Sequence, residues 1–470
     1  MYKTVLSLLI FFALASCTIG PNYRRLPVET PSGWRFEDAQ ALDVVNSPWW
    51  RQFGDPVLDS LIETALKENK DVRIAAARVE EFAGRYAYIR SGQFPQVGAA
   101  ASYERTKETI NQNPPWPSTA KNPSDTFQAL LTASWEIDIW GKLRRATESA
   151  RANLLSTEEG RRGVILTVVT AVAIAYTDLL DLDKQLDVAG RTVKSREDTL
   201  RLFKLRHQRG YVSNLELSQA ESEYNSALAT VPLLRKLIGQ QENALSILLG
   251  RNPAPIPRGK PLDFLTLPAV PAGLPSQLLE RRPDIRQAEQ DLIAANAQIG
   301  VAKAQYFPTI SLTGLFGVQS DDLSRLFTGP SRTWTYALPA TAPIFTAGGI
   351  AGTVKAAEAV QKETLIRYEQ VIQQAFREVE DGLIDQAETR EQLRTQREQV
   401  KSLQNYARLA TVRYNNGYTS YLEVLDSERS LFNAELAYAQ TQATLFRALV
   451  NLYKSMGGGW VAQAEELTRE

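Results

Sequence analysis

Very little of the chemistry that identifies common classes of enzyme is present in this sequence. Its 470 residues include one cysteine and one histidine. A single cysteine excludes an intramolecular disulfide, and a single histidine, His207, excludes a zinc site of the HExxH type. The sequence also has neither a Walker phosphate loop nor a GxSxG nucleophile motif. We therefore expect a protein that is not an enzyme and that holds no metal or dissociable cofactor, with His207 in a structural role.

An excess of charge of either sign is also missing. Lys and Arg together number 53, as do Asp and Glu, so the formal net charge is +0. A nucleic-acid partner would require a basic face, so we expect none. Long apolar runs are scarce too, because the uncharged apolar run GVILTVVTAVAIAYT from Gly163, in the body of the chain, is shorter than the ~20 residues of a membrane-spanning helix. We expect this run to be a buried helix.

The first residues carry a short apolar segment, VLSLLIFFALA, after Lys3. It is too short to span a bilayer and is typical of a secretory signal, which we predict over 1–16. The only cysteine, Cys17, follows the residues LAS, and this arrangement resembles a bacterial lipobox, in which the cysteine is acylated and becomes the mature N-terminus. Thr18 in place of an aspartate favours, by the same resemblance, export to the outer membrane. The only cofactor that we expect is this covalent lipid, on an N-terminal segment over 17–55.

One stretch of the sequence occurs twice, as RHQRGYVSNLELSQAESE from Arg206 and as RYNNGYTSYLEVLDSERS from Arg413. Each copy contains a Gly-Tyr pair, where glycine permits the backbone to reverse; the pairs are Gly210-Tyr211 and Gly417-Tyr418. The copies indicate a tandem duplication. The predicted organisation is repeat 1 over 56–250, a Pro-rich linker over 251–274, repeat 2 over 275–457 and a tail over 458–470.

Apolar residues recur every seven positions, in the same register, in both repeats. This pattern predicts long helices with coiled-coil-like packing, over 142–208 and 349–415. At ~1.5 Å per residue, each would be on the order of 100 Å long. The shorter predicted helices after the Gly-Tyr pairs are 213–249 and 419–456, and those that open the repeats are 56–90 and 275–305.

Between the opening helix and the long helix, each repeat alternates polar and apolar residues. Strict alternation predicts strands with one apolar and one polar face. The predicted strands are about 94–104 and 126–140 in repeat 1, and about 307–319 and 332–345 in repeat 2. Their lengths are close to the ~9–11 residues of a tilted membrane strand.

Four strands cannot close a membrane barrel, because open edges would leave backbone groups unpaired in lipid. The chain must therefore oligomerise if these strands enter a bilayer. Two chains would give a narrow, filled barrel, and three would give a twelve-stranded barrel with room for water. The pattern leaves open both numbers, and also a small soluble sandwich.

Several stretches resemble the TolC-like outer-membrane efflux channels, and most closely their NodT-type lipoprotein branch. They are PWWRQFGDPVLDSLIETALKENKDVRIAAARVEE from Pro48, RYNNGYTSYLEVLDSERSLFNAE from Arg413 and VNLYKSMGGGW from Val450. The resemblance implies a mixed α/β membrane protein in the bacterial outer membrane. It implies a homotrimeric β-barrel with four strands per chain, continuous with a long α-helical barrel in the periplasm. It also implies two partners, a periplasmic adaptor protein and an inner-membrane pump of the proton-driven RND type.

In this family, the hairpin of the second repeat lines the periplasmic constriction. The matching residues here are Leu422 and Asp426, which lie one helical turn apart on one face. Three copies of Asp426 would form a carboxylate ring that favours cations, whereas Gln219 occupies the matching place in the first copy. Residues near the turns that could hold the mouth closed are Arg206, Arg209, Arg413, Tyr414 and Glu423. The alternative is that these charges are ordinary solvated residues at helix ends.

We therefore expect the outer-membrane channel of a tripartite efflux system. It would be a passive duct that exports drugs and other small molecules, gated at the periplasmic helical tips. The alternative function is a lipid-anchored periplasmic scaffold of coiled coils without a pore. A periplasmic enzyme is the third possibility, and it would need a polar pocket for which the sequence offers no motif.

Overall fold

The computed structural model describes residues 18–25, 27–36, 48–111, 121–271, 273–457 and 460–461. The predicted signal over 1–16, the predicted acylation site Cys17 and most of the predicted tail over 458–470 lie outside the described residues. The chain divides into two compact units. We call them the sheet unit (residues 1–27, 79–157 and 288–368) and the helical unit (residues 28–78, 158–287 and 369–470).

Helices of equal length occur in pairs along the chain. The pairs are α3 (Lys70–Ser91) and α7 (Pro283–Ala304) with 22 residues each, α4 (Lys142–Gln208) and α8 (Gly349–Asn415) with 67 each, and α5 (Asn214–Leu248) and α9 (Tyr421–Ser455) with 35 each. These pairs confirm a fold built from a tandem structural repeat. The two long helices begin and end at the residues that the heptad pattern predicts.

The prediction of one continuous opening helix in repeat 1 is wrong. Helix α2 (Pro56–Glu68) ends one residue before Asn69, whose ψ of 132° is not helical. The side-chain oxygen of Asn69 accepts hydrogen bonds from the N–H groups of Asp71, at 2.8 Å, and Val72, at 3.2 Å. Asn69 therefore caps the start of α3, in the way that asparagine commonly satisfies the free donors of a first helical turn.

The opening helix of repeat 2 is also interrupted, so the prediction over 275–305 is wrong as well. It consists of the 3-10 turn η3 (Pro275–Gln277), the short helix α6 (Leu278–Arg281) and α7. The break falls at Arg282, whose ψ is 121°. Arg282 precedes Pro283, and a residue before proline is disfavoured in the helical region because of the proline ring.

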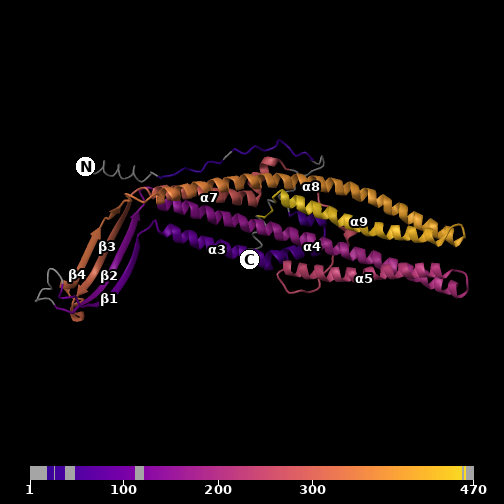
Figure 1. Ribbon diagram of the computed structural model, residues 1–470, viewed down its shortest axis with the longest axis horizontal. Coiled ribbons are helices and arrows are strands. Elements are labelled where there is room, and N and C mark those ends of the chain that lie inside the picture. The colour runs from indigo at the N-terminus through magenta and orange to yellow at the C-terminus, as the bar shows by residue number, and fades with distance from the viewer. Residues whose placement is uncertain are drawn as a thin grey trace. The chain divides into compact units, whose positions relative to one another are not determined.

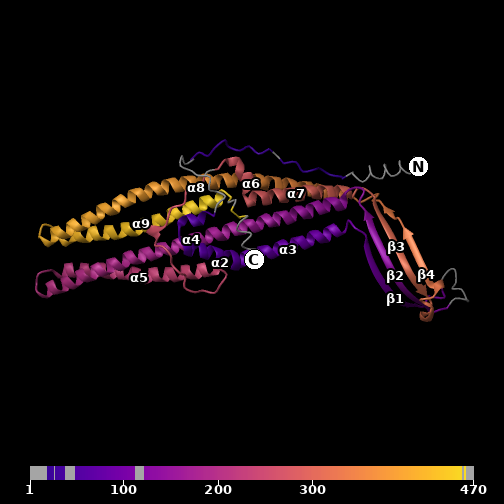
Figure 2. The same ribbon diagram turned by 180° about the vertical axis from the view of Figure 1, so that it is seen from behind.

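The sheet unit contains one antiparallel sheet. Its strands are β1 (Gln96–Thr106), β2 (Ser124–Ile137), β3 (Thr309–Ser320), β4 (Arg332–Ala337) and β5 (Ala340–Thr341). The order is β1-β2-β3-β4, and these four strands lie side by side in Figures 1 and 2. Strand β5 also pairs with β3.

The fourth strand is shorter than the predicted range of 332–345. Regular pairing stops at Ala337 and resumes at Ala340. Between them lies Pro339, which has no N–H to donate to a neighbouring strand. Its carbonyl oxygen still accepts a hydrogen bond of 3.1 Å from the N–H of Ser311. Strands β4 and β5 are thus two parts of one edge strand, interrupted at a proline.

The core of the helical unit is rich in aromatic side chains. The 3-10 helix η1 (Trp49–Phe53) packs against α9, with ring centroids 5.4 Å apart for Trp49 and Tyr453 and 5.3 Å apart for Phe53 and Phe446. The apolar run of α4 joins this core. Of its most apolar 18-residue window, 67% is buried inside the described part of the chain. This agrees with the prediction of a buried helix.

Candidate functional site

Two helical hairpins of the helical unit end in the same kind of turn. Figure 1 shows α4 joined to α5 and α8 joined to α9. The glycines of the two turns have φ values of +78° at Gly210 and +76° at Gly417. In each turn the tyrosine N–H donates to a carbonyl five residues back, from Tyr211 to Arg206 and from Tyr418 to Arg413, at 2.9 Å in both cases. This is the Schellman pattern, whose positive φ favours glycine, and the predicted hairpin tips are therefore present.

The glutamates of the two repeated Leu-Glu pairs make different contacts. In the first hairpin Glu216 forms a capping box with Ser213, in which each side chain accepts a hydrogen bond from the other residue's backbone N–H. In the second hairpin Ser420 has no side-chain cap. Glu423 instead forms an ion pair of 3.2 Å with Arg413 and accepts a hydrogen bond from Thr419. The second turn is thus held by contacts of its own between α8 and the start of α9.

The two hairpins pack on each other through three aromatic rings. Phe203 of α4 lies 4.3 Å from Tyr421 of α9 and 6.2 Å from Tyr414 of α8, and the two tyrosine rings are 5.4 Å apart. Of the gate-stabilising candidates, Tyr414 therefore does bridge neighbouring helices. Phe203 and Tyr421 were not predicted, because a buried aromatic residue near a turn has no distinguishing pattern in a single sequence.

The predicted gate residues share an exposed face of α9. Leu422 is 63% exposed and the side chain of Asp426 is 53% exposed. Asp426 faces Arg429, with 3.6 Å between the nearest nitrogen and oxygen atoms. At the matching place of the first hairpin, Gln219 is partly buried. Within one chain, Leu422 and Asp426 are free to face another molecule.

The basic residues before the first turn differ in their surroundings. Arg206 lies close enough to Tyr414 to influence its pKa: burial raises the pKa of Tyr414, the charge of Glu216 raises it further, and Arg206 lowers it. Nδ1 of His207 lies 3.1 Å from the carbonyl oxygen of Val212, as expected for a structural histidine. Arg209 is exposed.

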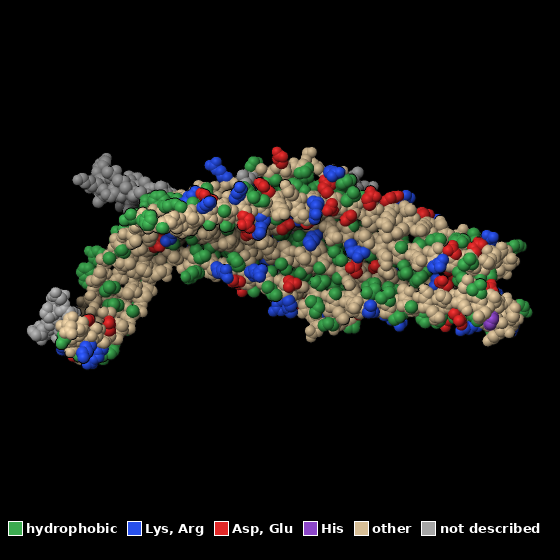
Figure 3. Space-filling model, viewed as in Figure 1, with side chains coloured by type: hydrophobic (Ala, Val, Ile, Leu, Met, Phe, Trp, Pro, Cys, Tyr) green, Lys and Arg blue, Asp and Glu red, His purple; other side chains and the backbone are tan. Residues whose placement is uncertain are grey.

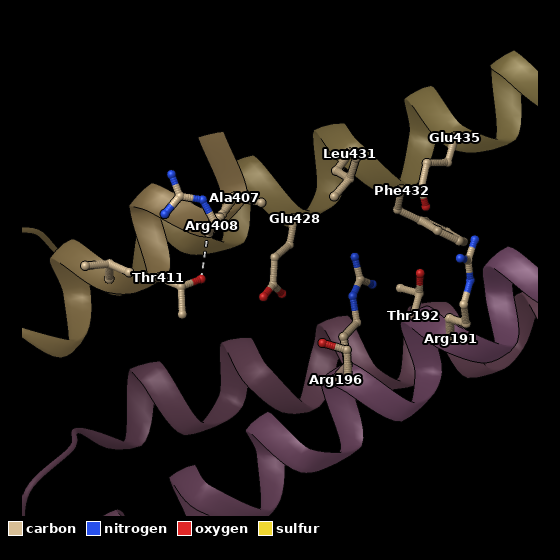
Figure 4. Close-up of a pocket in the computed structure, with 12 residues that line it drawn as sticks. Arg191, Thr192, Arg196, Ala407, Arg408, Thr411, Glu428, Leu431, Phe432 and Glu435 are labelled. Carbon is tan, nitrogen blue, oxygen red and sulfur yellow. Dashed lines mark hydrogen bonds between the residues drawn. The ribbon is translucent and has the colours of Figure 1, made fainter. Parts of the chain in front are cut away.

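A pocket of about 520 Å³ lies between the two hairpins. It is lined by charged residues that the sequence analysis did not predict. Figure 4 shows Glu428 of α9 pointing toward Arg196 of α4. The side chain of Arg196 is only 5% exposed and forms an ion pair of 3.0 Å with Glu223 of α5. Its guanidinium carbon also lies 5.5 Å from the centre of the Phe432 ring. One buried cation thus connects both helices of the first hairpin to the second.

The pKa of Glu428 makes the packing of the hairpins sensitive to pH. Burial raises the pKa of this carboxyl group, the charge of Arg196 lowers it in part, and Glu223 raises it. Because the pKa of Glu428 is raised in the folded state, this residue contributes fully to the free energy of unfolding below the ordinary glutamate pKa of ~4.3. That contribution is lost as the pH rises through the pKa of the folded state. We predict that Glu428→Gln raises the unfolding temperature of the purified protein at pH 7.5 and that the difference from the wild type disappears near pH 4.

The Arg196→Met variant is the matched control for this prediction. It should lower the unfolding temperature, because it leaves the carboxylates of Glu223 and Glu428 without their buried cation. A Glu428→Gln variant that is less stable than the wild type at pH 7.5 would show that attraction to Arg196 outweighs the cost of burial.

The sheet has two chemically different faces. Residues directly opposite each other on neighbouring strands share a face, and the register joins the apolar positions of all four strands. Across one row these are Ala99, Leu131, Phe316 and Trp334. The other face carries mainly small and polar side chains, including Ser102, Gln128, Thr132, Ser134, Thr313, Gln319, Thr333 and Thr335.

Charged residues are confined to the ends of these strands. They are Glu104, Arg105, Asp125, Glu136 and Arg332. All except Glu136 lie toward the loops that connect β1 to β2 and β3 to β4, and Figure 3 shows charged side chains gathered at this end of the sheet unit. Aromatic side chains stack on the apolar face, with ring centroids 4.8 Å apart for Tyr103 and Phe127. An uncharged apolar band bordered by aromatic rings is the pattern of strands that face lipid.

The described residues contain no group of three or more His, Cys, Asp or Glu side chains that could hold a metal ion. The described residues offer a sheet face suited to lipid, an opposite face suited to water, and charged helical tips.

Comparisons with known proteins agree with this architecture. A family model described as "Outer membrane efflux protein" matches residues 61–251 and 274–458. A relative in Pseudomonas putida, the probable efflux pump outer membrane protein TtgC, is 36% identical over 479 residues, which cover 100% of this chain and 98% of the relative. The cation efflux system protein CusC of Escherichia coli is 34% identical over 464 residues, which cover 96% of this chain and 97% of CusC.

Solved structures have the same fold. The open state of the MtrE outer membrane channel of Neisseria gonorrhoeae superposes with a TM-score of 0.85 at 31% identity, covering 94% of this chain and 99% of MtrE.

Proposed function

Because this chain belongs to the outer membrane efflux protein family, we propose that three copies of it assemble into one gated duct. The chain is an outer-membrane channel for efflux, as the family match and the shared fold indicate. The trimer, the lipid anchor and the gate are inferred from the geometry of the described residues, and the nature of the pump is inferred from the resemblance to the family. No catalytic step is part of this proposal.

The two faces of the sheet carry the proposal. In the described chain, β1 and β4 are the edges of the sheet, each with one side unpaired. An unpaired edge in lipid costs several kcal/mol per backbone group, so edges of neighbouring chains must pair. With four strand positions per chain, three chains give twelve strands, which enclose an aqueous lumen. The apolar face would then meet lipid, and the face with Thr132 and Gln128 would line the water.

The start of the described chain supports the lipid anchor on Cys17. Thr18, the next residue, packs against Gly141, where an added Cβ would lie 2.4 Å from a methyl carbon of Thr18. The following N–H, of Ile19, donates to the carbonyl of Trp140 at 3.0 Å. Arg145 then binds the carbonyls of Ile19 and Gly20. These contacts place the residue after Cys17 at the helix end of the sheet, where an acyl chain would reach the inner leaflet of the outer membrane.

The helical tips would form the gate of the duct. A trimer would bring three copies of Leu422 and Asp426 around one axis, narrowing the mouth and ringing it with carboxylates. The Ser213–Glu216 capping box in the first hairpin and the Arg413–Glu423 ion pair in the second hold the two turns in shape, so opening requires movement of whole hairpins. We propose that docking of a periplasmic adaptor biases this movement, and that an inner-membrane pump of the proton-driven RND type supplies the energy for export of drugs and other small molecules.

We predict that the protein extracted from outer membranes is a hollow particle with threefold symmetry and conducts ions in planar bilayers. Negative-stain imaging and single-channel recording on one preparation test both points, and the intact mass of the mature chain should exceed that of residues 17–470 by the mass of its acyl groups. A solid particle that never conducts would support the alternative, a lipid-anchored scaffold. An unmodified mass would remove the lipid anchor alone.

A further inference from the structure

The face of the sheet that would line the lumen carries an imbalance of charge. Among the residues of the described strands, its only ionisable side chains are Glu104 of β1 and Glu136 of β2. In the register, Glu104 lies opposite Thr126 and Glu136 lies opposite Ser311. No lysine or arginine of these strands falls on this face, because Arg105 and Arg332 both occupy positions of the apolar face.

The other two carboxylates of the described strands, those of Asp125 and Glu136, each have a basic partner. On the apolar face, Arg105 lies 3.5 Å from Asp125. On the polar face, Glu136 forms an ion pair of 2.7 Å with Lys142, at the start of α4. Both ion pairs form within a single chain, so each pair contributes no net charge whether or not the chains assemble.

Glu104 is the exception. It is exposed, and its carboxylate accepts a hydrogen bond of 3.1 Å from the hydroxyl of Thr106. No described residue forms an ion pair with Glu104, and the sequence over 112–120 contains no lysine or arginine. Lys107, the nearest basic residue after Arg105, lies beyond the end of β1 and forms no ion pair with Glu104 among the described residues. Each chain therefore presents one uncompensated carboxylate near the loop end of the polar face.

We propose that Glu104 forms a second carboxylate ring, at the outer end of the barrel, which makes the exit of the duct select cations over anions. This inference rests on the proposed trimer, in which three copies of Glu104 face one lumen. The potential of a fixed charge extends about 10 Å at 0.1 M salt and about 3 Å at 1 M, so the ring acts on a wide lumen only at low ionic strength. Cargo of positive or zero charge passes this exit more readily than anionic cargo does.

The Asp426→Asn background isolates this ring, because the narrow mouth at the helical tips would otherwise dominate selectivity. In that background, Glu104→Gln should lower the cation-to-anion permeability ratio roughly twofold in a gradient around 0.1 M salt. Glu104→Lys should bring the ratio below that of Glu104→Gln, and both differences should vanish in 1 M salt. The ratios come from reversal potentials in planar bilayers.

Arg105→Gln is the matched control, since it changes the charge of the adjacent residue, on the face that meets lipid. It should leave the ratio unchanged. Channels that conduct normally but keep the same ratio in both Glu104 variants would overturn the exit ring. An equal effect of Arg105→Gln would also overturn it, because the charge would then act without regard to the face. Absence of channels in every variant, including the wild type, would instead refute the proposed duct.

Discussion

Asp426→Asn is expected to lower the cation-to-anion permeability ratio of the channel about tenfold and to raise the single-channel conductance. A monovalent ion about 4 Å from one carboxylate gains about 1 kcal/mol even in bulk water. Three carboxylates around a narrow mouth therefore exceed the ~1.4 kcal/mol that corresponds to a tenfold change. Reversal potentials and current amplitudes in planar bilayers measure both quantities.

The first hairpin supplies the control for this experiment. Gln219→Asn changes the side chain at the matching place in the first repeat, where there is no charge to remove. It should leave the permeability ratio and the single-channel conductance unchanged. If Asp426→Asn gave the wild-type reversal potential and conductance, Asp426 would be an ordinary exposed acid beside Arg429, and the gate would lie elsewhere.

Leu131→Arg is expected to abolish assembly in the outer membrane. Leu131 lies in the middle of the apolar face, paired with Ala99 on β1 and Phe316 on β3, and is 54% exposed within one chain. An arginine that faces lipid at the bilayer midplane costs about 2–4 kcal/mol, and a trimer incurs this cost three times. The amount of heat-modifiable, SDS-resistant oligomer in outer-membrane fractions measures the effect.

The neighbouring Leu130 offers the same substitution on the other face. Leu130 pairs with Ala100 and Gly317, so in the proposed barrel Leu130→Arg places its charge in water. It should assemble at close to the wild-type level. Equal loss of oligomer in both variants would argue against a lumen on the polar face and in favour of a sheet that is dry on both sides.

The sequence predicted well those features that depend on a periodic pattern of apolar residues within one element. The heptad pattern predicted both 67-residue helices with approximate bounds, and the repeated Gly-Tyr pairs predicted both turns. Alternation also predicted the position and the two faces of the strands. A period of seven or two repeats over many residues, so the signal accumulates along each element and tolerates single exceptions.

Breaks within elements were predicted less well, because each depends on one residue and its surroundings. Asn69 caps α3 and also donates a hydrogen bond of 2.8 Å from its side chain to the carbonyl of Leu248. That partner lies 179 residues away in the chain. Pro339 ends β4 in a strand whose alternation of residues continues. At Asn69 and at Pro339, the periodic pattern of residues continues although one residue interrupts the helix or the strand. The pattern alone therefore does not predict the interruption.

The sequence by itself determined the duplication, the long helices and the two-faced strands, because spacing along one element sets all of these, whereas the resemblance to a known family singled out Leu422 and Asp426. Only the tertiary structure decided how the two hairpins hold each other. Phe203 meets Tyr414 and Tyr421, and Arg196 meets Glu223 and lies near Glu428. Most of these partners lie more than 200 residues apart, and a single sequence does not record which distant side chains fold against each other.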